Sequence, residues 1–381
     1  MNALLQDAFS GVRETIAFNR QAYELDRFNV KNREYAEGNL KVARLWSLYS
    51  PGMTFLSAVG AVLVLWYGAR QVMGGTMTLG ELVAFLSYLG LFYAPINQIH
   101  SINHMLQHAL AAGERVFEIL DAEPDLRESP HPLTLPAKAQ GYVRFDDVQF
   151  QYRDGLPVLR GLTLEVAPGE RAAIVGSSGS GKTTIASLLL RFYDATGGAI
   201  TIDGYDIHRF SLHFLREQIG LVRQDPFLFN GTVRENLAYG DLTATEEQMV
   251  QAARAARAHD FIMKLPEQYD TWIGERGVKL SIGEKQRLTI ARMLLKDPPI
   301  IILDEATSSV DTETEAGIQD ALDALTRDRT TLIIAHRLSS LKVADRIVVL
   351  DDGRIAEEGT HDALLHRQGL YAALFEAQLH L

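Results

Sequence analysis

Two long stretches without charged side chains limit what this chain can fold into. Residues 45–69 contain 25 residues and no Asp, Glu, Lys or Arg, and residues 82–113 contain 32 residues interrupted only by three histidines. Because a helix rises about 1.5 Å per residue, about 25 residues reach roughly 37 Å, which exceeds the hydrocarbon core of about 30 Å in a bilayer. The stretches therefore predict a transmembrane hairpin with spans at about residues 45–69 and 82–105.

The flanks of the first stretch indicate how this hairpin is oriented. Trp46 and Tyr49 stand at one end and Trp66 and Tyr67 at the other, as expected for aromatic belts at two membrane interfaces. Residues 1–44, which we expect to form a helix, hold seven Lys or Arg, and this bias predicts a cytoplasmic location for them and places the Gly-rich connection between the spans outside. The alternative is a pair of buried helices in a soluble core, but the lengths, belts and charge bias together favour the membrane.

The predicted transmembrane part, residues 1–120, begins with a segment of amphipathic character. Residues 11–28 predict a helix that presents Val12, Ile16 and Tyr23 on roughly one face. Such a face is suited to resting on a cytoplasmic domain, and an ordinary surface helix is the alternative.

The rest of the chain has the pattern of an α/β domain. Residues 121–141 carry four prolines and no apolar periodicity, which predicts a linker. Across residues 142–381, short apolar runs alternate with helical patterns, which is typical of a largely parallel sheet. Between about residues 226 and 290 the strand pattern disappears, so we expect an inserted helical subdomain there. The strand candidates are residues 142–152, RAAIVG (171–176), GAITIDG (198–204), IGLVRQD (219–225), PIIILD (299–304), TLIIAH (331–336) and RIVVLDDG (346–353).

Charge and composition exclude some classes of function. The formal charge of −11 argues against nucleic acid as the main partner, because phosphate backbones are bound by an excess of Lys and Arg. The absence of cysteine excludes disulfides and zinc sites with Cys ligands.

A glycine-rich loop between a predicted strand and a predicted helix indicates a phosphate site. Residues 176–183 read GSSGSGKT and match the P-loop pattern, in which backbone N–H groups surround phosphate oxygens. In that pattern Lys182 reaches the β- and γ-phosphates and Thr183 binds Mg²⁺, whereas a purely structural turn is the alternative. The predicted nucleotide-binding residues here are Gly176, Ser177, Ser178, Gly179, Ser180, Gly181, Lys182, Thr183 and Thr184.

A second chemical feature follows the apolar run at residues 300–303. Asp304 and Glu305 come at the end of this predicted strand. In P-loop NTPases an acid at such a strand end organises Mg²⁺ and a neighbouring residue polarises the attacking water. We therefore expect Asp304 to be a metal residue and Glu305 the general base, whereas a solvent-facing strand end is the alternative.

The ordered motifs together resemble the ATP-binding cassette (ABC) family over essentially the whole chain. The resemblance implies that Tyr152 stacks on adenine, that Gln224 contacts Mg²⁺ and the attacking water, and that His336 contacts the γ-phosphate. LSIGEKQR (280–287) resembles the family signature, and Asp311 in SSVD resembles the aspartate of the next loop.

The resemblance also implies that two such domains face each other head to tail, so that each signature contacts the ATP held by its partner. The helix after the signature would point its N-terminus at the γ-phosphate, with the Ser281 hydroxyl and the Gly283 N–H as donors. Ile282 and Glu284 depart from the commonest form, LSGGQ, and Glu284 places a negative charge near ATP. We expect an active site, and the alternative is the weaker half of an asymmetric heterodimer.

The order of hairpin, linker and cassette resembles the C-terminal part of an exporter half-transporter, a class that carries six spans where this chain shows two. A fragment, a misplaced gene start or a truncated gene would each account for the difference. We expect a multi-pass cell-membrane exporter subunit with a cytoplasmic ATPase domain, ATP and Mg²⁺ as cofactors, and a second half-transporter as partner. The transported solute or lipid is not indicated. The alternatives are a truncated ATPase that does not transport and a soluble P-loop phosphotransferase.

Overall fold

The computed structural model describes residues 2–124, 126, 128–133, 135, 138–152, 155–274, 277–304, 312–335, 341 and 343–379. The chain forms two compact units, Met1–Glu123 and Pro124–Leu381.

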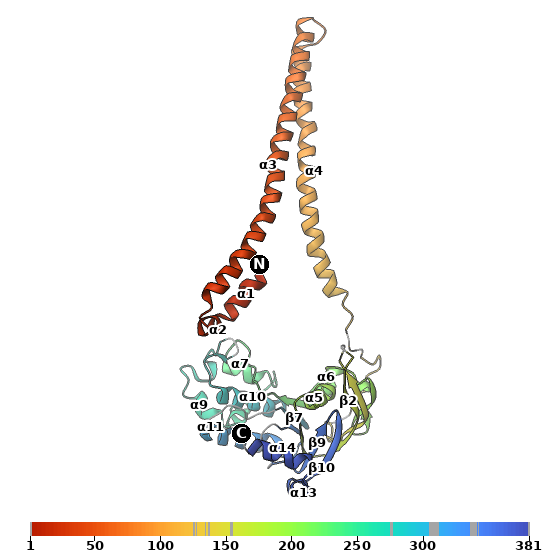
Figure 1. Cartoon of the computed structure of the whole chain (residues 1–381), viewed down its shortest axis with the longest axis vertical. Coiled ribbons are helices and arrows are strands. Elements are labelled where there is room, and N and C mark those ends of the chain that lie inside the picture. The colour runs from red at the N-terminus through yellow and green to blue at the C-terminus, as the bar shows by residue number, and fades with distance from the viewer. Residues whose placement is uncertain are drawn as a thin grey trace. The chain divides into compact units, whose positions relative to one another are not determined.

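The first unit is helical (Figure 1). Its elements are α1 (Asn2–Ser10), α2 (Val12–Ala17), α3 (Gln21–Met73) and α4 (Leu79–Leu120), of which α3 and α4 form a long hairpin. The hairpin is closely packed near its turn, because a Cβ added at Gly68 would lie 2.3 Å from Leu82 Cδ1. A small residue such as Gly68 at a helix contact allows two helices to approach closely. A capping box between Thr78 and Glu81 begins α4.

The predictions of one helix over residues 1–44 and of one helix over residues 11–28 are wrong. The helix ends at Ala17 and a new one begins at Gln21, with Asn19 between them in the left-handed region at a φ of 53°. Asn tolerates this conformation better than most residues, because its short polar side chain can form hydrogen bonds with the nearby backbone. The chain therefore turns between α2 and α3 instead of continuing the predicted face.

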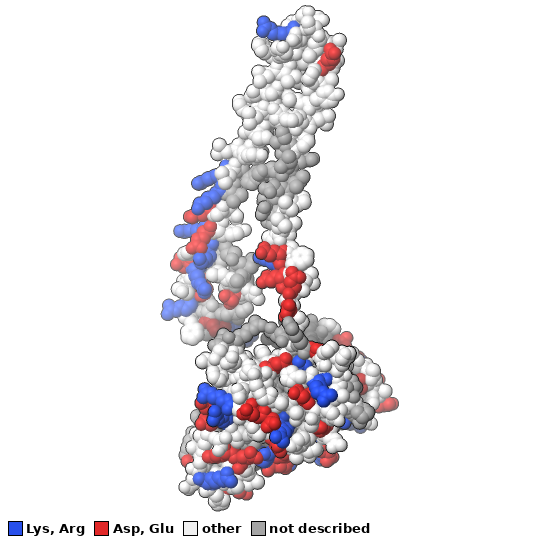
Figure 2. All heavy atoms as spheres, turned by 90° about the vertical axis from the view of Figure 1, so that its right-hand side faces the viewer, with Lys and Arg blue, Asp and Glu red and all other residues white. Residues whose placement is uncertain are grey.

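The apolar character of the hairpin is clear from its helices. Among the described residues, α3 is the one helix that is long and apolar enough to cross a membrane, and the apolar part of α4 is described over Leu79–Pro95. The side chains of residues 96–104, within the second predicted span, lie outside the described part. On the face shown in Figure 2, the charged side chains of this unit gather on the N-terminal half of α3, near the turn and at the end of α4. Both predicted spans stay predictions.

The second unit contains two sheets built from ten strands of the described part. In chain order they are β1 (Val143–Gln151), β2 (Pro157–Val166), β3 (Arg171–Gly176), β4 (Gly197–Ile202), β5 (Tyr205–Asp206), β6 (Ile219–Val222), β7 (Ile300–Asp304), β8 (Thr330–Ile334), β9 (Arg346–Asp351) and β10 (Arg354–Gly359). A six-stranded sheet has the order β10-β9-β3-β8-β7-β6 and is parallel except for β10. A four-stranded antiparallel sheet has the order β2-β1-β4-β5.

Each of the seven predicted runs forms a strand, and the α/β fold class is confirmed. The runs at residues 142–152 and 198–204 nevertheless belong to the antiparallel sheet, as β1 and β4, and not to the parallel one. Periodicity identifies a strand but does not tell which neighbour it pairs with, and therefore the second sheet was not predicted.

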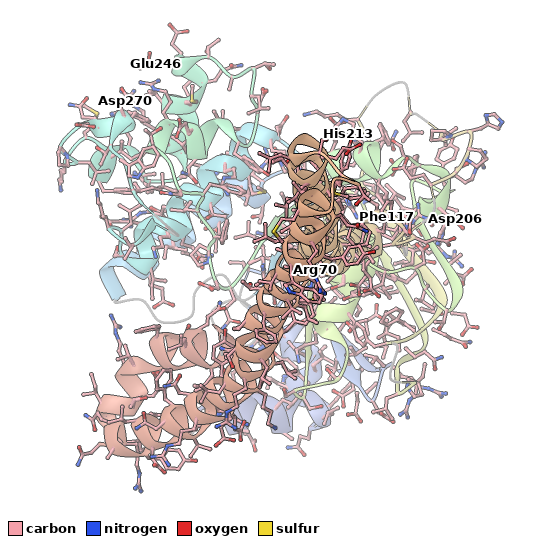
Figure 3. The ribbon with its side chains drawn as sticks, turned by 90° about the horizontal axis from the view of Figure 1, so that it is seen from above. Arg70, Phe117, Asp206, His213, Glu246 and Asp270 are labelled. Carbon is pink, nitrogen blue, oxygen red and sulfur yellow. The ribbon has the colours of Figure 1, made fainter. Side chains whose placement is uncertain are left out.

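Helices cover the six-stranded sheet and fill the segment between β6 and β7. They are α5 (Lys182–Leu189), α6 (Leu212–Glu217), α7 (Val233–Ala238), α8 (Glu246–Ala255), α9 (His259–Ile262), α10 (Ile282–Lys296), α11 (Thr312–Thr326), α13 (His361–His366) and α14 (Leu370–Leu379), with 3₁₀ turns η1 (Ile207–Arg209) and η2 (Gln268–Asp270). Arg234 on α7 pairs with Asp270 at 2.8 Å and with Glu246 at 3.3 Å, and the two acids lie on the outer side of this helical segment (Figure 3).

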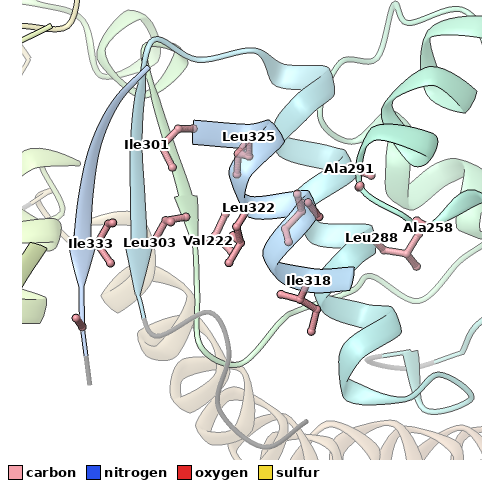
Figure 4. Close-up of a cluster of buried hydrophobic side chains, with 14 of the residues drawn as sticks. Val222, Ala258, Leu288, Ala291, Ile301, Leu303, Ile318, Leu322, Leu325 and Ile333 are labelled. Carbon is pink, nitrogen blue, oxygen red and sulfur yellow. The ribbon is translucent and has the colours of Figure 1, made fainter. Parts of the chain in front are cut away.

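One apolar core joins the helical segment to the sheet. Ile301 and Leu303 of β7 face α11, whose Leu322 and Leu325 are buried, and α10 packs behind α11 through Leu288 (Figure 4). Burial of one such side chain stabilises the fold by about 1.5–3 kcal/mol. The core thereby holds α10 against α11, which packs on the sheet.

Candidate nucleotide-binding site

The predicted P-loop lies where β3 passes into α5. β3 ends at Gly176, the loop runs through Gly181, and α5 begins at Lys182. Gly176, Gly179 and Gly181 have φ values of 155°, 83° and 106°, and the last two lie in the left-handed region that favours glycine. The strand, loop and helix order that the motif requires is therefore present.

The loop fits a phosphate group. A Cβ at Gly179 would meet nothing within 4 Å, so space is open beside it. No side chain among the described residues caps α5, which leaves its first N–H groups available to an anion. The Ser180 hydroxyl is buried, and among the described residues it has no hydrogen-bond partner. Together these features form a polar cradle that an anion can complete.

The first three side chains of α5 differ in their surroundings. The Lys182 ammonium donates to the Gly176 carbonyl at 2.9 Å and to the Ser177 carbonyl at 2.8 Å, so it curls over the loop. Thr183 is exposed, whereas Thr184 is buried. Lys182 thus lies at the position from which it would reach a bound phosphate, and Thr183 is accessible to a metal ion.

Asp304 and Gln224 lie at the same edge of the sheet as the P-loop. Asp304 ends β7 and is in register with Ile334 of β8, which is in register with Ile174 of β3. Gln224 follows β6 by two residues and is exposed. Because carboxyl ends of parallel strands meet at one edge, the topology gathers the P-loop, the carboxylate and the amide.

Tyr152 contacts the P-loop helix directly. Its hydroxyl lies 3.1 Å from the Thr184 hydroxyl, and its ring packs edge-to-face against Tyr193, with ring centroids 5.3 Å apart. Phe150 completes this aromatic cluster, and its ring centroid lies 4.8 Å from that of Tyr152. Tyr193 was not predicted as a site residue, because only the structure shows that it lies beside the predicted adenine residue.

The signature begins α10, as expected, but its hydroxyl is engaged within the chain. Ser281 is the N-cap, and its N–H and hydroxyl each donate to Glu284 Oε2 at 2.8 Å. In return the Glu284 N–H donates to Ser281 Oγ at 3.3 Å, which completes a capping box, and Gly283 is buried beside them. The Ser-x-x-Glu spacing is the signal that could have predicted this box.

Three predicted site residues, Glu305, Asp311 and His336, lie outside the described residues. Their assigned roles stay predictions.

Comparison with known proteins agrees with this architecture. The family model described as ABC transporter matches residues 159–308, and the model described as ABC transporter transmembrane region matches residues 1–96. The match over the hairpin associates the chain with the membrane.

The relatives extend the match to nearly the full chain. An ATP-dependent lipid A-core flippase of Syntrophus aciditrophicus (strain SB) is 47% identical over 99% of this chain and 63% of its own length. An ABC transporter ATP-binding protein of Bacillus subtilis (strain 168) is 43% identical over 99% of this chain and 62% of its own length. The chain thus spans a little under two thirds of these curated relatives.

A solved structure of a bacterial Atm1-family ABC exporter with ATP bound superposes with a TM-score of 0.88. It is 38% identical and covers 99% of this chain and 66% of its own. Fold, site geometry and relatives agree that this chain, a nucleotide-binding domain preceded by part of a transmembrane region, belongs to the ABC transporter family.

Proposed function

We propose that this chain is the ATP-binding and ATP-hydrolysing part of an ABC exporter subunit, which couples hydrolysis to the outward movement of a solute or lipid. The observation that carries the proposal is the gathering of the P-loop, Asp304 and Gln224 at one edge of the parallel sheet. The names of the relatives, a flippase and an exporter, support export as the work that hydrolysis drives.

The residues of this chain divide the chemistry among them. Lys182 and the N–H groups of the P-loop bind and orient the phosphates of ATP. Thr183, Gln224 and Asp304 would hold Mg²⁺, which neutralises phosphate charge when it is bound. Glu305 accepts the proton of the attacking water as general base.

The adenine and γ-phosphate ends of ATP are assigned to two further residues. Tyr152 stacks on the adenine, next to Thr184 at the start of α5. His336 contacts the γ-phosphate. Both roles are carried over from the family pattern at matching positions.

The signature supports a dimer of two cassettes. Ser281, Gly283 and Asp311 would complete the site of a partner cassette, so each ATP would lie between two chains. The partner is a second half-transporter. An ATP site between two cassettes can form whether the two half-transporters are identical or different. In this arrangement the hairpin spans the cell membrane twice, among further spans of the dimer, and the cassette is cytoplasmic.

The first test is the ATPase rate as a function of protein concentration in lipid, with Glu305→Gln as the blank. We expect the specific ATPase rate to rise with protein concentration, because the site needs two chains. The rate should vanish in Glu305→Gln, because this variant lacks the general base. Sizing with ATP should show that Glu305→Gln accumulates as a dimer. Normal hydrolysis by Glu305→Gln would refute the assignment of the base, and an inactive wild type would refute the motor function.

A further inference from the structure

Arg292 is a buried cation on the signature helix, 11 residues after Ser281, which corresponds to about three helical turns. Its side chain is 7% exposed, and burial lowers the pKa of its guanidinium to about 10, so it remains charged at neutral pH. A buried charge is stable only when hydrogen bonds compensate for the lost water. The partners of Arg292 therefore show what it is fixed to.

These partners are backbone and amide oxygens of the segment between β6 and α10. Arg292 Nε donates to the Asn236 carbonyl at 2.9 Å, and Nη2 donates to Asn236 Oδ1 at 2.8 Å. Nη1 donates to the Phe227 carbonyl at 3.2 Å. The guanidinium carbon also lies 5.6 Å from the ring centre of Phe229 and 5.4 Å from that of Tyr239. Within the described residues no carboxylate forms a salt bridge with it.

Asn236 on α7 forms further hydrogen bonds to the same segment. Its amide nitrogen donates to the carbonyls of Phe229 at 2.9 Å and Thr232 at 3.0 Å, and its oxygen accepts the Phe229 N–H at 2.8 Å. Residues 227–229 are thus held against both α7 and α10. Phe227 is only three residues after Gln224, so little chain separates the Arg292 contact from the residue that is predicted to contact Mg²⁺ and the attacking water.

The far end of α10 holds the chain on the other side of Gln224. Lys296 Nζ donates to the Ile219 and Arg216 carbonyls, each at 2.7 Å, and Ile219 begins the strand that leads to Gln224. The helix that begins with the signature is therefore bonded to the chain before and after Gln224. A displacement of either element would strain these buried bonds.

We propose that Arg292 is a positioning residue that ties the Gln224 segment to the helix carrying Ser281. The inference rests on the proposed function. If Gln224 serves the ATP held by its own chain and Ser281 serves the ATP held by the partner, Arg292 links the two ATP sites through one chain. A linked pair of this kind is recognised by non-additive effects of substitution.

The test is a pair of double-mutant cycles on the full chain in lipid. Arg292→Met removes the donors but keeps an unbranched side chain beside the two rings, and Arg292→Lys keeps the charge with one donor group. We expect Arg292→Met to lower kcat about tenfold or more, and Arg292→Lys to fall between it and the wild type. Nucleotide affinity at low protein concentration should change less than about twofold, because Arg292 does not contact the P-loop.

The cycles combine Arg292→Met with Gln224→Ala and, separately, with Ser281→Ala. We expect each double variant to be no more than about twofold slower than its slower single variant. Leu364→Ala, a buried change on α13, serves as the control for lost stability; it should lower Tm without lowering kcat by more than about twofold. If Arg292→Met does not fold, Arg292→Lys takes its place in both cycles.

Multiplicative losses in either cycle would overturn the proposal, as would a loss of kcat that Leu364→Ala reproduces at equal Tm. An inactive wild type would instead refute the proposed function. In that case the same cycles are measured on ATP-dependent association by sedimentation, where additive effects would again overturn the role of Arg292.

Discussion

Glu284→Gln tests the departure of this signature from its common form. The Glu284 carboxylate accepts both the N–H and the hydroxyl of Ser281 at 2.8 Å. A phosphate oxygen that accepts the same hydroxyl would come within about 6 Å of the carboxylate. In the proposed dimer, Glu284 would therefore compete with the partner's ATP for the Ser281 hydroxyl and would also repel that ATP.

The size of the repulsion follows from this distance. Two unit charges about 6 Å apart interact with about 0.7 kcal/mol in water and about 2.8 kcal/mol at an effective dielectric constant of 20. Removing the charge should therefore strengthen the interaction at each ATP site of the dimer by about threefold to 100-fold, with the larger values at low salt. Gln keeps an oxygen for the Ser281 N–H, so the helix cap should remain.

The assay is sizing in a Glu305→Gln background over a range of ATP concentrations, with and without Glu284→Gln. The matched control is Glu235→Gln, because Thr232 and Glu235 form the same capping box on α7. We expect the ATP midpoint of dimer formation to fall for Glu284→Gln and to stay unchanged for Glu235→Gln. An unchanged or higher midpoint for Glu284→Gln would refute the competition.

Three further predictions concern the P-loop, an ion pair and the core. Gly181→Ala should destabilise the fold by about 1–2 kcal/mol in chemical denaturation and weaken nucleotide binding, because φ is 106° and its Cβ would lie 2.8 Å from Leu159. Hydrogen bonds from Arg171 lower the pKa of Asp345, so this carboxylate stabilises the fold above about pH 4 and loses that effect as pH falls through the depressed value. The unfolding free energies of Asp345→Asn and wild type should accordingly differ at pH 7 and converge in acid; a constant difference would contradict this. Leu325→Ala, fully buried, should cost about 2–5 kcal/mol, and a loss below about 1 kcal/mol would show that its surroundings collapse into the space.

Features that depend on local pattern could be predicted from the sequence. The run at residues 300–303 is apolar throughout because β7 is buried on both faces between β6 and β8. Lys182 and its loop follow a fixed spacing because phosphate geometry requires it. The strand β2 was not predicted, because Arg160, Gly161 and Thr163 interrupt its apolar residues.

Features that depend on distant contacts could not be predicted. Asn236 and Arg292 are 56 residues apart, and the sequence around each of them does not indicate that they share two hydrogen bonds. Tyr193 joins Tyr152 only because β1 and the end of α5 meet in space. The turn at Asn19 is a third example, since one residue in the left-handed region outweighed a favourable helical periodicity.

The position of β3 has a consequence for how the protein is made. Its neighbours in the sheet are β8 and β9, which span Thr330–Ile334 and Arg346–Asp351 near the end of the chain. During synthesis the strand that carries the P-loop therefore stays without both partners until the ribosome has translated most of the domain. Nucleotide binding should thus appear late in translation, and a chain that stops before β8 would expose the two edges of an apolar strand to chaperones and proteases.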